Sequence, residues 1–222
     1  MDLMEAMARR HAVRAYLDRP LAGAELEALE AAVARVNRES GLHIQLVKNE
    51  PQAFDSTLAH YGKFSGVANY LALVGPKGPE LEERCGYYGE HIVLEAQRLG
   101  LNTCWVALTY KKVPSAFTVS PGEKLVMVIA VGYGATQGAA HRSKEESTVS
   151  VAEGGAAPEW FRRGVQAALL APTAMNQQKF RFTLQDGRVT AKAGFGTYTK
   201  VDLGIAKYHF ELGAAPETVD WA

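Results

Sequence analysis

The chain has 222 residues and a mass of 24.1 kDa, with 47% hydrophobic and 22% charged residues. This composition is that of an ordinary globular protein and excludes a disordered chain, a collagen-like repeat or a coiled-coil rod. A chain of this size can bury about 70% of its unfolded surface, so one domain or two small fused halves need no disulfide or metal. The 24 basic and 24 acidic residues cancel, which argues against nucleic acid and anionic membranes as partners.

The two cysteines and the N-terminus indicate the cellular compartment. Neither Cys85 nor Cys104 belongs to a CxxC pair or to a cluster with zinc-ligand spacing. The acidic N-terminal residues are typical of neither a secretory signal nor a transit peptide. The most apolar run, Leu125 to Val131, is too short to span a bilayer. The sequence therefore predicts a reduced, cytoplasmic protein with no metal site and no membrane segment.

The first part of the chain alternates between helical and strand patterns. Apolar residues at helical spacing predict helices over Leu3 to Arg10 and Ala24 to Asn37. Alternating polarity predicts a half-buried strand over Leu42 to Val47, and an unbroken apolar run predicts a buried strand over Tyr70 to Val74. A helix is then expected from about Glu80 to Leu99, because Gly100 is typical of a helix end.

After a buried strand predicted over Leu125 to Val131, glycines and alanines in residues 132–155 indicate an extended connector. Three further elements are expected beyond it: a helix over Pro158 to Leu170, a hairpin of Phe180–Leu184 and Arg188–Ala193 around Asp186-Gly187, and a final helix over Asp202 to Leu212. This order lacks a steady β-α-β alternation and predicts an α+β fold, with a mixed β-sheet and flanking helices.

Three polar segments are candidates for a binding site. Arg10, His11, Ala12 and Arg14 lie in a segment with three arginines in six residues, whose guanidinium groups suit a phosphate, although such a cluster can also be a solvated surface. Residues 100–106 are a candidate as a polar turn after a helix, although they can also be simply a helix end that leads into the core. Residues 171–178 (APTAMNQQ) offer amide and hydroxyl groups suited to the edge of a heteroaromatic ring, or form an ordinary polar loop.

Together, four segments in order resemble the FMN-dependent nitroreductase family. RHAVRAYLDRP (residues 10–20) is similar to its R-[RH]-S-x-R-x-F-x-x-x-P motif, and GLNTCWVAL (100–108) to its G-L-x-[ST]-x-W motif. VMVIAVGYGA (126–135) is similar to the end of its G-Y-P strand, and APTAMNQQKFRF (171–182) to its A-P-S-x-x-N-x-Q-P-W-x-F motif. The resemblance covers nearly the whole chain and implies that FMN is the cofactor.

The resemblance also implies which residues bind FMN, and none of them is expected to be a catalytic acid or base. The implied cofactor-binding residues are Arg10, His11, Ala12, Arg14, Tyr61, Val106, Ala107, Leu108, Arg142, Lys144, Pro172, Thr173 and Asn176. Three positions depart from the family pattern: Ala12 replaces a serine that binds phosphate, Lys179 replaces a proline, and Phe180 replaces a tryptophan. Whether the altered Gln-Lys-Phe segment preserves turnover is left open by these departures.

The order of the motifs implies an unusual assembly. In common members, the A-P-S-x-x-N segment soon follows the arginine motif, and two subunits build each flavin site. Here that segment comes late, at residues 171–178. The resemblance therefore implies a fused pseudo-dimer of two related halves, residues 1–140 and 158–222, joined by a connector at 141–157. One chain would then hold one flavin site, and the protein would be a monomer or a weak homodimer.

The implied activity is the transfer of electrons from NAD(P)H through FMN to a nitroaromatic, a quinone or a similar small acceptor. No Ser/His/Asp arrangement stands at catalytic spacing, which agrees with chemistry carried by a cofactor. A flavin-binding or flavin-sensing module without turnover is the alternative, and an inert α+β domain is a third possibility. The sequence does not distinguish NADH from NADPH or name the acceptor.

Overall fold

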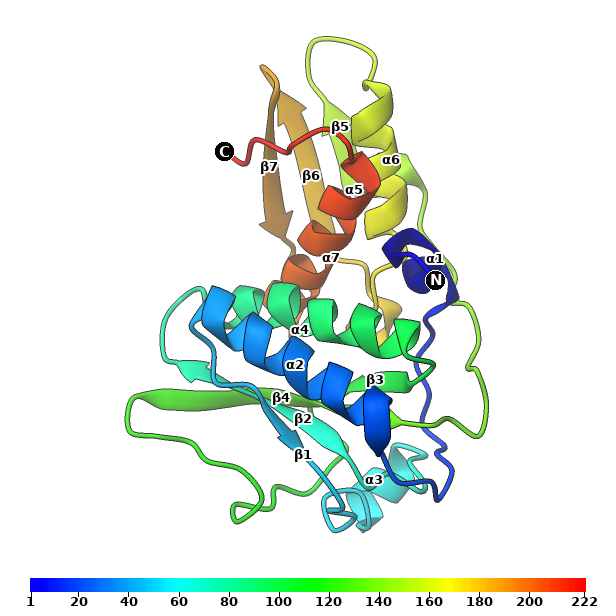
Figure 1. Ribbon diagram of the computed structural model, residues 1–222. Helices are drawn as coiled ribbons and strands as arrows, with labels where there is room; N and C mark the ends of the chain where they lie inside the picture. The colour runs from blue at the N-terminus through cyan, green and yellow to red at the C-terminus, as the bar shows by residue number, and fades with distance from the viewer.

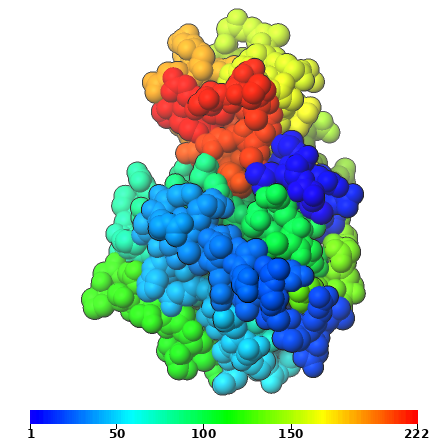
Figure 2. Space-filling model, in the orientation of Figure 1, coloured from blue at the N-terminus to red at the C-terminus, as the bar shows by residue number.

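Two separate β-sheets, which lie in different lobes, organise the fold. The computed structural model describes residues 1–222. The first lobe contains helices α2 to α4 and strands β1 to β4, and the second lobe contains helices α5 to α7 and strands β5 to β7 (Figure 1). In the space-filling view, the N-terminal helix α1 (Leu3–Arg9) lies against the junction of the two lobes (Figure 2). None of the helices combines the length and the apolar character needed to cross a bilayer.

The first sheet has the strand order β1-β2-β4-β3, with every pair antiparallel. Its strands are β1 (Gln45–Val47), β2 (Tyr70–Pro76), β3 (Asn102–Val106) and β4 (Glu123–Gly132). Because side chains alternate along a strand, Leu71 and Leu73 of β2 join the core beneath the helices, whereas Tyr70 packs with Phe54 on the opposite face. Helices α2 (Gly23–Ser40) and α4 (Leu81–Arg98) belong to the helical side, and the short α3 (Thr57–Tyr61) to the other.

The second sheet has the order β5-β6-β7 and is mixed. Strand β5 (Ser150–Ala152) runs parallel to β6 (Phe180–Gln185), which forms an antiparallel hairpin with β7 (Arg188–Ala193). The hairpin turn is tight because Asp186 and Gly187 both adopt positive φ, as expected of an Asp-Gly turn. Helices α6 (Glu159–Ala168) and α7 (Thr199–Ala214) complete this lobe, and Phe182 of β6 stacks on Phe210 of α7 at 4.6 Å.

The lobes are joined where α4 and α7 cross, which is the most extensive contact between any two elements. Gly86 of α4 faces the backbone of Val201, and Gly204 of α7 faces the backbone of Glu83. A Cβ atom at Gly204 would overlap the carbonyl oxygen of Glu83 and lie 2.6 Å from the amide nitrogen of Tyr87. The two helices can approach this closely only because both positions lack a side chain.

The α+β class and all nine predicted elements are confirmed, with end shifts of up to three residues. The strands nevertheless form two sheets instead of one, because β5 in the connector pairs with β6 of the predicted hairpin. The connector at 141–157 is accordingly not a plain linker: it contains α5 (Glu146–Val149) and β5. Strand β3 and helix α3 also lie outside the predicted elements. For residues 100–106 the sequence leaves open a polar turn or an entry into the core, and the structure has a largely buried strand there.

Replacing Gly204 by alanine tests the helix crossing. The added methyl group would force α7 away from α4, so we expect G204A to lower the free energy of unfolding by about 3 kcal/mol, measured by chemical denaturation. Gly78→Ala is the control, because a Cβ at Gly78 meets no atom within 4 Å, and its effect should stay within about 0.5 kcal/mol. Equal stability of the two variants would contradict the close crossing.

Candidate functional site

A cavity of about 300 Å³ is lined by residues from both lobes. This volume lies at the lower end of the range for small-molecule sites, about 300–1,000 Å³. The first lobe and the segment that leads into it supply one wall: Arg10, Ala12, Arg14, Cys104, Trp105, Val106, Ala107, Leu108 and Met127. The second lobe supplies the other: Pro172, Thr173, Ala174, Met175, Thr197, Tyr198, Val201, Asp202 and Ile205.

The arginine segment reaches the cavity because it is fixed to the edge of the first sheet. The amide of Val13 donates to the carbonyl of Thr103 at 3.0 Å, so the segment runs beside β3. Val13 is buried, whereas Arg14 is exposed, with its guanidinium carbon 5.8 Å from the ring centre of Phe64. The segment is thus packed, and Arg14 presents its charge at the cavity.

Arg10 contributes a second cation, in a different environment. Its residue is only 4% exposed, and its Nε lies 3.8 Å from a carboxylate oxygen of Glu90. Burial lowers the pKa of Arg10, and the negative charge of Glu90 opposes this shift. The Nε atom has no hydrogen-bond partner. A buried donor without a hydrogen-bond partner is costly in free energy. An acceptor atom of a bound ligand would remove this cost.

The wall formed by β3 and the residues after it is largely apolar. Trp105 donates from its indole Nε1 to Glu90 at 3.0 Å, which fixes the ring. Burial raises the pKa of the Cys104 thiol, although Arg14 and Arg10 oppose this shift. The thiol therefore stays protonated and is no nucleophile. Val106 is buried and Leu108 is exposed, so the wall passes from the interior to the surface.

Asp202 at the start of α7 holds the wall of the second lobe in place. Its two carboxylate oxygens accept from the amide of Ala174 at 2.9 Å and from the side chain of Gln177 at 2.7 Å. Burial raises the pKa of Asp202 to about 6, against the lowering effect of both hydrogen bonds. These bonds stabilise a loop in which Met175 adopts the left-handed conformation that a non-glycine residue seldom adopts.

Eight of the thirteen sequence-predicted residues line this cavity, and five do not. Those that line it are Arg10, Ala12, Arg14, Val106, Ala107, Leu108, Pro172 and Thr173. The five outside its lining are His11, Tyr61, Arg142, Lys144 and Asn176. Asn176 donates to the carbonyl of Arg142 at 2.9 Å, and the Lys144 ammonium donates to the carbonyl of Gln177 at 2.7 Å. In this structure their polar groups tether the 171–178 loop, and Tyr61 is exposed.

Sequence reasoning missed several residues of the cavity, and three of them lie on α7. Val201, Asp202 and Ile205 of α7 belong to the wall, with Tyr198 just before the helix, whereas the sequence predicts only a final helix there. A signal was present, because an aspartate inside a helix that is apolar on nearly every face is unusual. No group of three or more His, Cys, Asp or Glu residues is arranged to hold a metal ion.

This geometry suits a flat ligand with an anionic group. The walls are mostly apolar, and two guanidinium groups stand on one side of the cavity. Guanidinium groups bind phosphate or a delocalised anion through forked hydrogen bonds, whereas apolar walls favour burial of an aromatic ring. The residues able to hold such a cofactor therefore come from both lobes.

Comparison with known proteins identifies the fold and the family. The family described as "Putative TM nitroreductase" matches residues 2–214. A "putative nitroreductase" from Thermotoga maritima has 22% identity and a TM-score of 0.63, over 96% of this chain and 83% of that one. No curated protein matches the sequence.

Two further solved structures share the fold over about two thirds of this chain. A "putative nitroreductase" from Desulfovibrio desulfuricans, in complex with FMN, has 14% identity and a TM-score of 0.53, over 67% of this chain and 95% of that one. A "putative NADH dehydrogenase/NAD(P)H nitroreductase" from Parabacteroides distasonis has 18% identity and a TM-score of 0.52, over 66% and 95%. Since the family match spans nearly the whole sequence, the chain belongs to this nitroreductase family.

Proposed function

We propose that the protein is an FMN-dependent oxidoreductase that takes electrons from NAD(P)H and passes them to a nitroaromatic, a quinone or a similar small acceptor. The observation that carries the proposal is the single cavity whose lining includes both the arginine segment and residues 172–175. Membership of the nitroreductase family supports the same class of reaction. When bound, the flavin would supply the electron transfer, and the protein would supply binding, orientation and electrostatics.

The lining residues fit FMN in charge and in polarity. The unpartnered Nε of Arg10 and the exposed guanidinium of Arg14 are suited to the phosphate or to the pyrimidine edge of the ring. Ala12 offers no hydroxyl, so at that position only backbone groups, with those of His11, can contribute. Apolar residues from Val106 to Leu108 and the segment from Pro172 to Thr173 would enclose the ring.

The remaining predicted residues take an indirect part in this proposal. Arg142, Lys144 and Asn176 hold the 171–178 loop by hydrogen bonds, and a direct contact with FMN stays a prediction, as it does for Tyr61. At the cavity, Leu108 and Met175 are 66% and 89% exposed. Such exposed apolar side chains would favour an aromatic electron acceptor over a charged one.

We also propose that each chain holds one FMN, as a fused pseudo-dimer would. The proposal is supported by the two walls of the cavity, because each lobe supplies one of them. The alternative, a flavin-binding module without turnover, is motivated by the unusual Gln-Lys-Phe segment at 178–180. Bleaching of the flavin spectrum by NADH or NADPH separates the two functions, since a module without turnover would keep its oxidised absorbance.

Replacing Arg14 by alanine tests the binding of FMN. The loss of one charge-assisted hydrogen-bonding group should weaken FMN binding by about 1.5–3 kcal/mol, roughly 10- to 100-fold in Kd, as measured by quenching of flavin fluorescence. Stability should be unchanged, because Arg14 is exposed.

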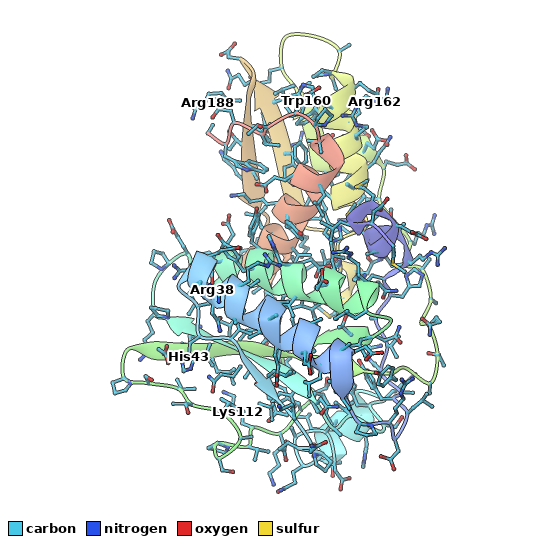
Figure 3. All side chains as sticks on the ribbon, in the orientation of Figure 1. Arg38, His43, Lys112, Trp160, Arg162 and Arg188 are labelled. Atoms are coloured by element: carbon cyan, nitrogen blue, oxygen red, sulfur yellow. The ribbon has the colours of Figure 1, made fainter.

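Arg38→Ala is the matched control for this measurement. Arg38 is an exposed arginine on α2, away from the cavity lining (Figure 3), and its removal should leave FMN affinity as it is. Equal affinity of the R14A and R38A variants would remove Arg14 from the site.

Mixing two defective chains tests whether one chain builds the whole site. R14A impairs the first wall, and Ala174→Trp fills the cavity from the second wall. If each chain contains one complete site, the purified wild type should bind about one FMN per chain, and the mixed variants should bind no more FMN than either variant alone. Recovery of FMN binding in the mixture would show that two chains share each site.

A further inference from the structure

A fully exposed aromatic side chain stands beside the second wall of the cavity. Phe195 is 100% exposed and lies in the loop of residues 194–198 between β7 and α7. Thr197 and Tyr198 of the same loop line the cavity, and Thr197 is exposed. Because two residues of chain span at most about 7 Å, Phe195 lies close to the mouth of the cavity.

The backbone around Phe195 is held in place by hydrogen bonds. The amide of Gly194 donates to the carbonyl of Lys179 at 2.8 Å. The ammonium of Lys179 in turn donates to the carbonyl of Phe195 at 3.1 Å. The side chain of Gln177 donates to the carbonyl of Thr197 at 2.9 Å. The loop is therefore anchored before, at and after the exposed aromatic residue.

The residues that anchor this loop also fix the cavity wall. The side-chain nitrogen of Gln177 that bonds the loop also donates to Asp202 at 2.7 Å. Asp202 accepts as well from the amide of Ala174, which lines the cavity. Phe195 and the 171–178 loop thus belong to one hydrogen-bonded frame, so the ring is carried at a fixed place relative to the cavity.

Lys179 is one of the positions that depart from the pattern of the nitroreductase family, in which a proline is usual. A proline side chain has no donor and could not bond the carbonyl of Phe195. The Gln-Lys-Phe segment at 178–180 therefore has a role in this structure that its sequence does not reveal. It anchors the loop that presents Phe195.

Three exposed apolar side chains stand at the opening of the cavity. Leu108 and Met175 line the cavity, and Phe195 lies beside it. Single exposed apolar residues are common on protein surfaces, whereas a group of them at a cavity marks a binding surface. Gly194 and Gly196 flank Phe195 in the sequence, so no side chain of a neighbour covers its ring. The ring is available to pack on a second flat ring.

We propose that Phe195 is a specificity-determining residue, which packs its ring on an uncharged aromatic electron acceptor at the mouth of the cavity, and that Lys179 positions it. An uncharged ring is favoured because Leu108 and Met175, at the same opening, are apolar. The role of this ligand as an electron acceptor rests on the proposed function. The contact itself can be measured without turnover.

The first experiment measures binding of p-dinitrobenzene to the oxidised, FMN-loaded protein by equilibrium dialysis, with no reductant present. Phe195→Leu keeps an apolar side chain but removes the aromatic ring, so we expect Kd to rise roughly 3- to 10-fold. Phe195→Tyr keeps the ring and should keep the wild-type Kd.

Leu17→Ala is the control for this measurement. Leu17 is also an exposed apolar residue, 51% exposed, but it lies outside the cavity lining. Its replacement should leave the Kd of p-dinitrobenzene unchanged. Equal Kd values for the F195L and L17A variants would overturn the proposal.

The second experiment separates the acceptor from the electron donor. In F195L, the rate at which NADH or NADPH bleaches the flavin should be unchanged, whereas KM for p-dinitrobenzene should rise by the same factor as Kd. Slower bleaching with an unchanged Kd for p-dinitrobenzene would mean that Phe195 contacts the nicotinamide, and the proposal would fail.

Lys179→Met tests the positioning role, because methionine has a similar length and no donor. We expect K179M to raise the Kd of p-dinitrobenzene, and Lys179→Arg, which keeps a donor, to restore it. Since Lys179 acts through Phe195, the double variant K179M/F195L should bind no more weakly than F195L alone. Additive losses would contradict this role of Lys179.

The remaining outcomes are distinguishable. If a second copy of the chain covered Phe195, sedimentation would show a wild-type dimer and an F195L monomer, which would overturn the proposal. If the wild type bound no FMN, the proposed function would fail. A higher Kd of p-dinitrobenzene for F195L than for the wild type would then still support the contact, and equal values would overturn it. Circular dichroism checks that F195L folds, and the comparison of K179M with K179R stands if it does not.

Discussion

The close crossing of α4 and α7 is the contact on which the rest of the structure depends. Backbone meets backbone there because Gly86 and Gly204 have no side chains, and one turn beyond Gly86 the same helix places Glu90 opposite His209. A larger residue at either glycine would separate the helices, widen the cavity and break the hydrogen bond between Glu90 and His209. The shape of the site therefore depends on the absence of a side chain at two positions that are not part of its lining.

The positive and the negative side chains of the cavity lie on opposite walls, and this separation of charge favours one orientation of a charged ligand. Arg10 and Arg14 supply positive charge from the first lobe, whereas the second lobe supplies Asp202, whose raised pKa reflects its burial. A ligand with an anionic group is thus attracted to one wall and disfavoured at the other. Apolar side chains between these groups bury a ring without competing for its orientation. One ligand orientation is favoured before any specific hydrogen bond forms.

Much of the fold follows from local patterns, whereas the site does so only in part. The long helices have strong apolar periodicity, and the strands β2 and β4 have unbroken apolar runs. These patterns are local, so they can be recognised without knowing which elements pack together. Strands β3 and β5 are short and polar at one end, and they become strands only because β4 and β6 pair with them. The arginine segment stands out in the sequence, but Glu90 and His209 look like surface and core residues of ordinary helices. Their meeting depends on the tertiary crossing, which no local pattern encodes.

The strand that the connector contributes to the second sheet shortens the free link between the lobes, and helix α1 limits how they can move. A free linker would allow the two lobes to move apart. In this fold, however, β5 fixes the connector to β6, and α1 packs on both α4 and α7. A hinge between the lobes would have to break the packing of α1 on these two helices together with the glycine crossing. We therefore expect the distance between the lobes to stay the same during a catalytic cycle. Ligand exchange would then depend on small movements at the mouth of the cavity, where Leu108 and Met175 are the exposed apolar side chains.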